Sequence, residues 1–241
     1  MKTAITTLVF VSAALGASAP ASAQLFGGKP KIEVTYVVMS KSDGLYAQDE
    51  KPLVDATFVF IAAREIAETE RGRNQNRRIQ INLTTEATNA VFSGTGDQLQ
   101  RDGGRIFERI SGFEQRCNDL TRSYANIARD IAIHGYESIR IIHIGPFVNV
   151  PAPCESAGSI HVPQTVSQEV ELAAILSEAK RADFVALMVH PDQYAPLWDY
   201  LNAFGDAGME DKSIQILRPD ETRTWINYLD QGVAPVGGDD K

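Results

Sequence analysis

Apolar residues recur along the chain with two different spacings. Some runs are apolar at nearly every position or at every second position, which is typical of strands buried on both faces or on one. Between these runs, apolar residues recur three and four positions apart, which is typical of helices that bury one side. The predicted strands are residues 32–39, 78–84, 138–145, 183–189 and 213–217. The predicted helices are residues 52–69, 119–134, 165–180, 196–204 and 220–229.

The segment after the second predicted strand is less regular. Residues 90–92 are apolar and are placed to form a hairpin with the strand at 78–84. Residues 94–104 contain several glycines and predict a loop or a broken helix. Further along, Thr165 and Gln168 have the spacing of a capping box, which predicts that a helix begins there.

Strands that alternate with helices predict an α/β fold with a mainly parallel central sheet. Such a sheet is covered by helices on both faces, which gives three layers. The sequence shows no linker between residues 32 and 230, so we predict one domain over this range. Residues 24–31 are predicted to be a linker, and residues 231–241 a disordered tail.

The first 23 residues have the order of charge and hydropathy that is typical of a secretory signal peptide. Lys2 precedes an apolar run over residues 4–15, and small residues end in Ala21-Ser22-Ala23 before Gln24. The alternative is a membrane anchor, but the run is shorter than the ~20 residues that span a bilayer. We therefore predict cleavage after Ala23 and a bacterial protein of the periplasm or the exterior, with no transmembrane segment in the mature chain.

Composition narrows the classes of function. The formal net charge of −8 disfavours a broad contact with nucleic acid or anionic lipid. Two cysteines exclude a disulfide-dense scaffold and a four-cysteine zinc site, and the four histidines show no H-x-x-x-H spacing. No metal or other cofactor is therefore expected.

The order of the elements resembles that of the von Willebrand factor type A (vWA) family. In this family a buried strand ends in Asp-x-Ser-x-Ser, which supplies oxygen ligands to a metal ion. Ser40 and Ser42 match the two serines, but Val38 stands where the aspartate belongs. The family's later aspartate belongs near Ile144, where there is no carboxylate. The hairpin after residue 78 resembles the family's second strand and its short antiparallel edge strand.

The resemblance implies a vWA-like domain whose metal site is degenerate, since two hydroxyls without carboxylates bind Mg²⁺ or Ca²⁺ very weakly. Ligands of parallel sheets usually bind outside the carboxyl ends of the strands. The candidate binding-surface residues expected there are Ser40, Lys41, Ser42, Asp43, Thr84, Glu86, His190 and Asp192. Through these loops the domain is expected to bind another protein, whose identity the sequence does not give.

The alternative function is a periplasmic hydrolase that uses Ser40 or Ser42 as the nucleophile and His190 as the base. Neither serine stands in a G-x-S-x-G elbow, and His190 is equally suited to an ordinary loop. The two hypotheses differ in whether a serine is reactive and whether a partner protein is bound.

A dense basic patch is a candidate docking site, and the two cysteines are candidates for a disulfide. The patch consists of Arg71, Arg73, Arg77 and Arg78. It predicts either a solvated loop or a docking site for an acidic partner, in which case charge reversal at Arg73 and Arg77 leaves folding intact. In a vWA-like topology Cys117 and Cys154 fall at the same end of the sheet, and an exported chain with two cysteines tends to pair them. The resemblance therefore implies a Cys117–Cys154 disulfide that ties down the long loop after residue 146.

Overall fold

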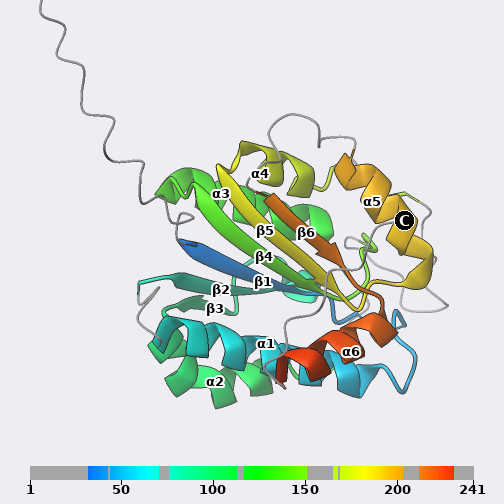
Figure 1. Cartoon of the computed structure of the whole chain (residues 1–241), viewed down its shortest axis with the longest axis horizontal. Coiled ribbons are helices and arrows are strands. Elements are labelled where there is room, and N and C mark those ends of the chain that lie inside the picture. The colour runs from blue at the N-terminus through cyan, green and yellow to red at the C-terminus, as the bar shows by residue number, and fades with distance from the viewer. Residues whose placement is uncertain are drawn as a thin grey trace, which may run out of the picture. The chain divides into compact units, whose positions relative to one another are not determined.

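Six strands form one sheet with helices on both of its faces (Figure 1). The computed structural model describes residues 32–42, 44–70, 76–112, 117–150, 165–167, 169–202 and 212–230. The strands are β1 (Val34–Met39), β2 (Arg78–Leu83), β3 (Phe92–Gly94), β4 (Ser138–Ile144), β5 (Arg181–Leu187) and β6 (Lys212–Ile216). Their spatial order is β3-β2-β1-β4-β5-β6, and every neighbouring pair is parallel except β2 and β3. The predicted fold class, including the short antiparallel edge strand, is confirmed.

Two apolar cores lie on opposite faces of the sheet. The helices are α1 (Lys51–Glu70), α2 (Gly96–Ile110), α3 (Leu120–His134), α4 (Leu172–Glu178), α5 (Tyr194–Asn202) and α6 (Pro219–Asp230). Figure 1 shows α3, α4 and α5 on one face and α1, α2 and α6 on the other. Within β1, Tyr36 and Val38 belong to the core under α3, whereas Val37 and Met39 belong to the core under α1. Burial on both faces explains why the strand reads as a continuous apolar run.

The segment after β3 differs from the prediction. Residues 94–104 were predicted as a loop or broken helix, but α2 runs unbroken from Gly96 to Ile110. Thr95 and Gln98 form a capping box that starts the helix, and Leu99 and Ile106 are buried along its inner side. This burial offsets the low helix propensity of Gly103 and Gly104 in the interior of α2.

The helix predicted from residue 165 is also wrong at its start. α4 begins only at Leu172, and Glu171 before it makes no side-chain cap. Thr165 therefore caps no helix, although the sequence spacing was right for it. The last helix begins at Pro219, so Asp220 lies in its first turn rather than at the cap.

The segments predicted at the two ends of the chain lie outside the described residues. This concerns the signal peptide and linker over residues 1–31 and the tail over residues 231–241. Among the described residues, no helix combines the length and the apolar character that crossing a membrane requires.

Candidate functional site

The carboxyl ends of β1 and β2 and the start of α3 bring three polar side chains together. Ser40 follows β1 and Thr84 follows β2, and these neighbouring parallel strands end at the same edge of the sheet. Asn118, which precedes α3, reaches the same place. We call Ser40, Thr84 and Asn118 the strand-end cluster. All three residues are fully buried.

The cluster is closed by hydrogen bonds within the protein. The Ser40 hydroxyl donates to Asn118 Oδ1 at 2.6 Å, and the Thr84 hydroxyl donates to the same oxygen. Asn118 Nδ2 donates to the carbonyl oxygen of Val148 at 2.5 Å. Each polar group thus has a protein partner, as buried polar groups require. Asn118 was not predicted as a site residue, because only its position before a helix, and no motif, distinguishes it in the sequence.

The backbone around Asn118 fastens the loop that leaves β4. Asn118 and Val150 exchange two backbone hydrogen bonds, of 2.9 and 2.8 Å. The amide of Asp119 donates to the carbonyl oxygen of Thr84 at 2.9 Å. Asn149 Oδ1 accepts from the amide of Leu120 at 2.9 Å, which satisfies one of the free amides at the start of α3. The loops after β2 and β4 and the start of α3 therefore form one connected unit.

Aromatic residues lie beneath this unit. His143 Nδ1 lies 3.0 Å from the Tyr124 hydroxyl, and the imidazole ring packs on Phe147 with 4.2 Å between ring centroids. Phe147 is held in turn by Gln193, which accepts from its amide at 2.8 Å and donates to its carbonyl at 2.7 Å. Complete burial lowers the pKa of His143 to about 3, so the ring is neutral at physiological pH. His143 is thus a hydrogen-bonded residue of the core.

The residues that follow Ser40 are buried as well. Lys41 is 3% exposed, and its Nζ lies 2.5 Å from Asp55 Oδ1 on α1. Ser42 is fully buried. Gly145 packs closely against the backbone at Ser40. A Cβ at this position would lie only 2.8 Å from the Ser40 carbonyl oxygen, so a larger residue would not fit. Its φ of +120° is also a conformation that favours glycine.

Half of the predicted binding-surface residues have little exposed area. Ser40, Lys41, Ser42 and Thr84 are buried, so they can offer little surface to a partner, and their role as contact residues stays a prediction. Burial depends on how the loops fold over the strand ends, which strand-end position alone does not reveal. Asp43 lies outside the described residues.

Glu86, His190 and Asp192 do have accessible side chains near this edge. Glu86 lies 3.7 Å from Arg109, and both side chains are about half exposed, at 44% and 53%. His190 Nδ1 accepts from the amide of Asp192 at 3.3 Å, which caps the short 3₁₀ helix Pro191–Gln193. These three residues remain candidates for a contact surface.

Ser40, one of the two candidate nucleophiles of the hydrolase hypothesis, is not brought together with His190. Ser40 Oγ donates to Asn118 and, at 3.2 Å, to the Pro146 carbonyl oxygen, whereas the ring nitrogen of His190 is engaged by Asp192. Ser40 follows β1 and His190 follows β5, with β4 between them, which separates the strands by ~10 Å. A buried serine without a basic partner is not an activated nucleophile.

The donor set does not fit a hard divalent cation. Such an ion needs several oxygen ligands, including carboxylates. Val38 is fully buried in the apolar core, and its neighbours in the sheet are Asn82 and His143. Within the described ranges, no group of three or more His, Cys, Asp or Glu residues is placed to hold a metal ion.

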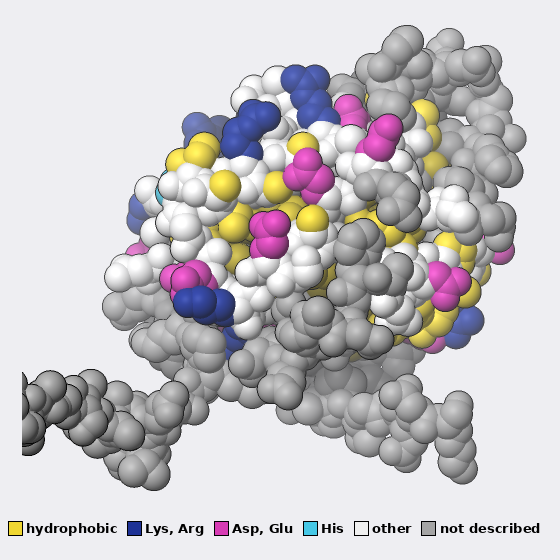
Figure 2. All heavy atoms as spheres, turned by 90° about the horizontal axis from the view of Figure 1, so that it is seen from above, with side chains coloured by type: hydrophobic (Ala, Val, Ile, Leu, Met, Phe, Trp, Pro, Cys, Tyr) yellow, Lys and Arg dark blue, Asp and Glu magenta, His cyan; other side chains and the backbone are white. Residues whose placement is uncertain are grey.

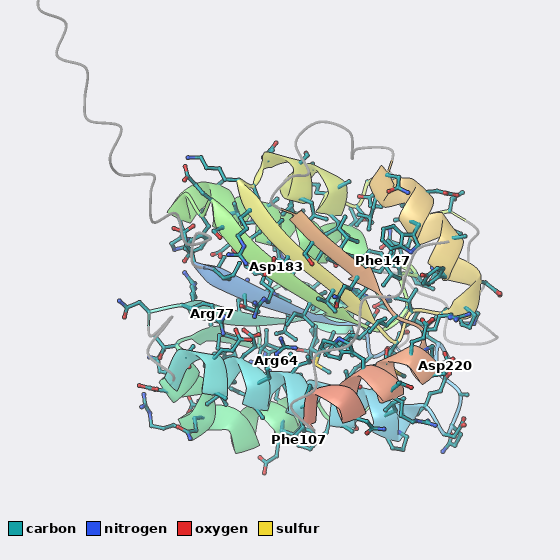
Figure 3. The ribbon with its side chains drawn as sticks, in the orientation of Figure 1. Arg64, Arg77, Phe107, Phe147, Asp183 and Asp220 are labelled. Atoms are coloured by element: carbon teal, nitrogen blue, oxygen red, sulfur yellow. The ribbon has the colours of Figure 1, made fainter. Side chains whose placement is uncertain are left out.

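The predicted basic docking loop is corrected at Arg77. Its guanidinium lies 2.9 Å from carboxylate oxygens of both Glu65 and Glu68, and its side chain is not exposed. Figure 3 shows Arg77 between the sheet and α1. Arg140 on β4 binds the same two glutamates, at 3.0 and 2.9 Å. Burial alone would raise the pKa of Glu68, but Arg140 and Arg77 lower it to about 2. Charge reversal at Arg77 would therefore disturb folding, contrary to the prediction.

Arg78 is also engaged rather than offered to a partner. Its Nε donates to Ser93 on β3 at 2.8 Å, and its Nη1 lies 3.0 Å from His134 at the end of α3. Arg71 and Arg73 lie outside the described residues. A docking role for this segment thus rests on those two residues alone and stays a prediction.

The predicted disulfide falls on Cys154, which lies outside the described residues, so the pairing stays a prediction. There is no free cysteine in the part of the chain that the structure describes. Cys117 directly precedes Asn118, and Asn118 is paired with Val150, four residues before Cys154. This register brings the start of the long loop close to Cys117.

Comparison with known proteins addresses the fold. No protein-family model matches the chain, and no curated protein matches it. A von Willebrand factor type A structure from Catenulispora acidiphila is 13% identical with a TM-score of 0.46, covering 81% of this chain and 41% of that one. The pilus adhesin SpaC from Lactobacillus rhamnosus GG, in its open conformation, is 8% identical with a TM-score of 0.52, covering 85% and 30%. Proximal thread matrix protein 1 from the mussel byssus is 8% identical with a TM-score of 0.41, covering 80% and 43%.

The present chain spans less than half the length of each of these proteins. At such low identities the likeness concerns the fold and not the activity. The chain has a vWA-like α/β fold, as the sequence resemblance predicted.

Proposed function

We propose that this chain is an exported, non-catalytic protein-binding or assembly module that works without a metal ion. The observation that carries the proposal is the closed strand-end cluster. At the edge where ligands of parallel sheets usually bind, Ser40 and Thr84 are buried and hydrogen-bonded to Asn118. These hydroxyls serve the protein's own loops, so neither catalysis nor metal binding is expected of them.

Two further lines support a binding role outside the cell. SpaC, whose fold is similar with a TM-score of 0.52, is described as a pilus adhesin. The first 23 residues have the order of a secretory signal peptide. We infer a mature protein of the periplasm or the exterior that contacts another protein through accessible residues such as Glu86, His190 and Asp192. No observation favours the hydrolase alternative.

The test is capture of a partner by the tagged mature chain, residues 24–241, from the native organism after reversible cross-linking. Capture is expected to be the same with and without EDTA. Glu86→Arg and Asp192→Arg should each reduce it, whereas Asp97→Arg, an exposed change on α2, should not. Loss of capture in EDTA, restored by Mg²⁺ or Mn²⁺, would contradict metal independence.

Two measurements on the purified chain test the remaining parts. Calorimetric titration with Mg²⁺ and Mn²⁺ is expected to give no binding in the micromolar range. A serine-directed fluorophosphonate probe is expected to leave the protein unlabelled, because Ser40 and Ser42 are fully buried. Labelling that disappears in Ser40→Ala would favour the hydrolase instead.

A further inference from the structure

A groove of about 350 Å³ lies between α3 and α4. Glu137 directly precedes β4 and Ala179 precedes β5, so the groove opens toward the amino ends of these strands, away from the strand-end cluster. Its floor is apolar and consists of small alanines with two isoleucines: Ala128, Ile131, Ala132, Ala174, Ile175 and Ala179. Figure 2 shows exposed hydrophobic side chains on this side of the molecule, with acidic and basic side chains around them.

The shape of the floor suits an approaching helix. Ala128 and Ala132 are one helical turn apart on α3, and Ala174 faces the same groove from α4. Small residues at such positions let a helix axis approach to the 8–10 Å at which helices pack. The exposed alanines 132 and 174 leave room for larger apolar side chains of a partner.

The rim of the groove is acidic. Glu137, Glu171 and Glu178 line it and are exposed. Glu137 is neutralised by Lys180, at 2.7 Å. No basic side chain among the described residues forms an ion pair with Glu171 or Glu178 within 4 Å. Glu171 directly precedes α4 and Glu178 is its last residue, so the two carboxylates are seven positions apart, which corresponds to ~10 Å along a helix.

We propose that the α3–α4 groove docks a basic amphipathic helix of a partner protein. Its leucine-like side chains would lie on the alanine floor, and two lysines or arginines seven positions apart would face Glu171 and Glu178. This is recognition of a helix in a groove, with apolar anchors that supply affinity and charges that set register. The inference goes beyond the proposed function by adding a second contact surface, at the opposite ends of the strands from Glu86, His190 and Asp192, and it rests on that proposal only in taking the partner to be a protein.

The test uses a fluorescein-labelled amphipathic peptide and the full mature chain. The peptide carries two lysines seven positions apart with two adjacent leucines between them, in an alanine and glutamine background. Fluorescence polarisation at low salt is expected to show saturable binding. A peptide with glutamates in place of the lysines is expected to bind at least tenfold more weakly.

Matched variants separate the groove from general acidity. Glu178→Lys and Ala132→Trp are expected to weaken binding at least tenfold. Glu108→Lys, an equal charge change in the last turn of α2, and Ala56→Trp, on the exposed side of α1, should change it less than twofold. Circular dichroism melts identify any variant that fails to fold, and the second groove variant then decides the result.

Three outcomes would overturn the proposal. They are equal losses in groove and control variants, no saturable binding of the basic peptide, and a concentration-dependent dimer in sedimentation velocity that Ala132→Trp abolishes. The last outcome would assign the groove to a second copy of this chain. Because the peptide assay needs neither export nor the strand-end surface, its failure is distinguishable from failure of partner capture.

Discussion

Replacing His143 by glutamine should remove a large part of the protein's sensitivity to mild acid. The imidazole is fully buried between Tyr124 and Phe147, and its Nε2 has no hydrogen-bond partner. In the unfolded chain a histidine has a pKa of about 6.5. Burial lowers the pKa of His143 to about 3 in the folded protein. Between these values the unfolded state binds the additional proton.

The sign and size follow from proton linkage. Protonation gives His143 a positive charge, which the unfolded state accepts more readily than the folded state. The folded state is therefore destabilised as the pH falls below 6.5. Each pH unit below 6.5 costs about 1.4 kcal/mol, until the pH reaches the folded pKa. Between pH 7 and pH 5 the free energy of unfolding should therefore decrease by about 2 kcal/mol through His143 alone.

Urea unfolding of the wild type and His143→Gln at pH 7, 6 and 5 measures this directly. Glutamine has no titrating group, so other residues contribute equally to both proteins and cancel in the difference. The stability difference between the two proteins should shift by about 2 kcal/mol in favour of the variant on going to pH 5. A difference that stays constant across this range would refute the burial argument.

Three other changes test the interior described above. Arg77→Ala should lower the free energy of unfolding in urea by about 3–5 kcal/mol, because it removes one of the positive charges that balance the buried Glu65 carboxylate. Arg105→Ala, at an exposed position of α2, should lower it by less than about 1 kcal/mol. Equal losses would contradict the buried ion-pair network. Asn118→Ala should lower the free energy of unfolding by about 2–3 kcal/mol, because it removes the acceptor shared by Ser40 and Thr84. Asn202→Ala on α5 serves as its control. A loss below about 0.5 kcal/mol would mean that these hydrogen bonds do not stabilise the fold. Mass spectrometry of the alkylated, non-reduced mature chain should detect a Cys117–Cys154 disulfide worth about 3–4 kcal/mol, and two alkylated cysteines would end that prediction.

Hydropathy predicted most of the fold, because burial of parallel strands on both faces leaves long apolar runs. It failed where helix formation depends on the surroundings of the helix. α2 contains Gly103 and Gly104, which locally favour a break, yet Leu99 and Ile106 pack inward and keep it continuous. The spacing of Thr165 and Gln168 imitates a helix start, but α4 begins seven residues after Thr165.

The sequence predicted where in the sheet the site residues lie, but not that several of them are buried. Strand order located Ser40 and Thr84 correctly at one edge of the sheet, because parallel strands end together. Their burial depends on Asn118 and on the loop after β4, which are distant in sequence. Arg77 looked like part of a basic loop because its neighbours in sequence are arginines, whereas its neighbours in space are Glu65 and Glu68.

The ion pairs around Arg140 bear on how long the folded state persists. They join α1 to β4 and β5, and their partners are far apart in sequence: Glu65 and Arg140 by 75 residues, Arg140 and Asp183 by 43. Contacts of such long sequence separation form only after the strands have paired, so they are expected to contribute little to the transition state for folding. Their energy should then appear mainly as a slower unfolding rate. If the chain is exported, as proposed above, no ATP-driven chaperone refolds it outside the cell, and a slow unfolding rate is then more useful than rapid folding.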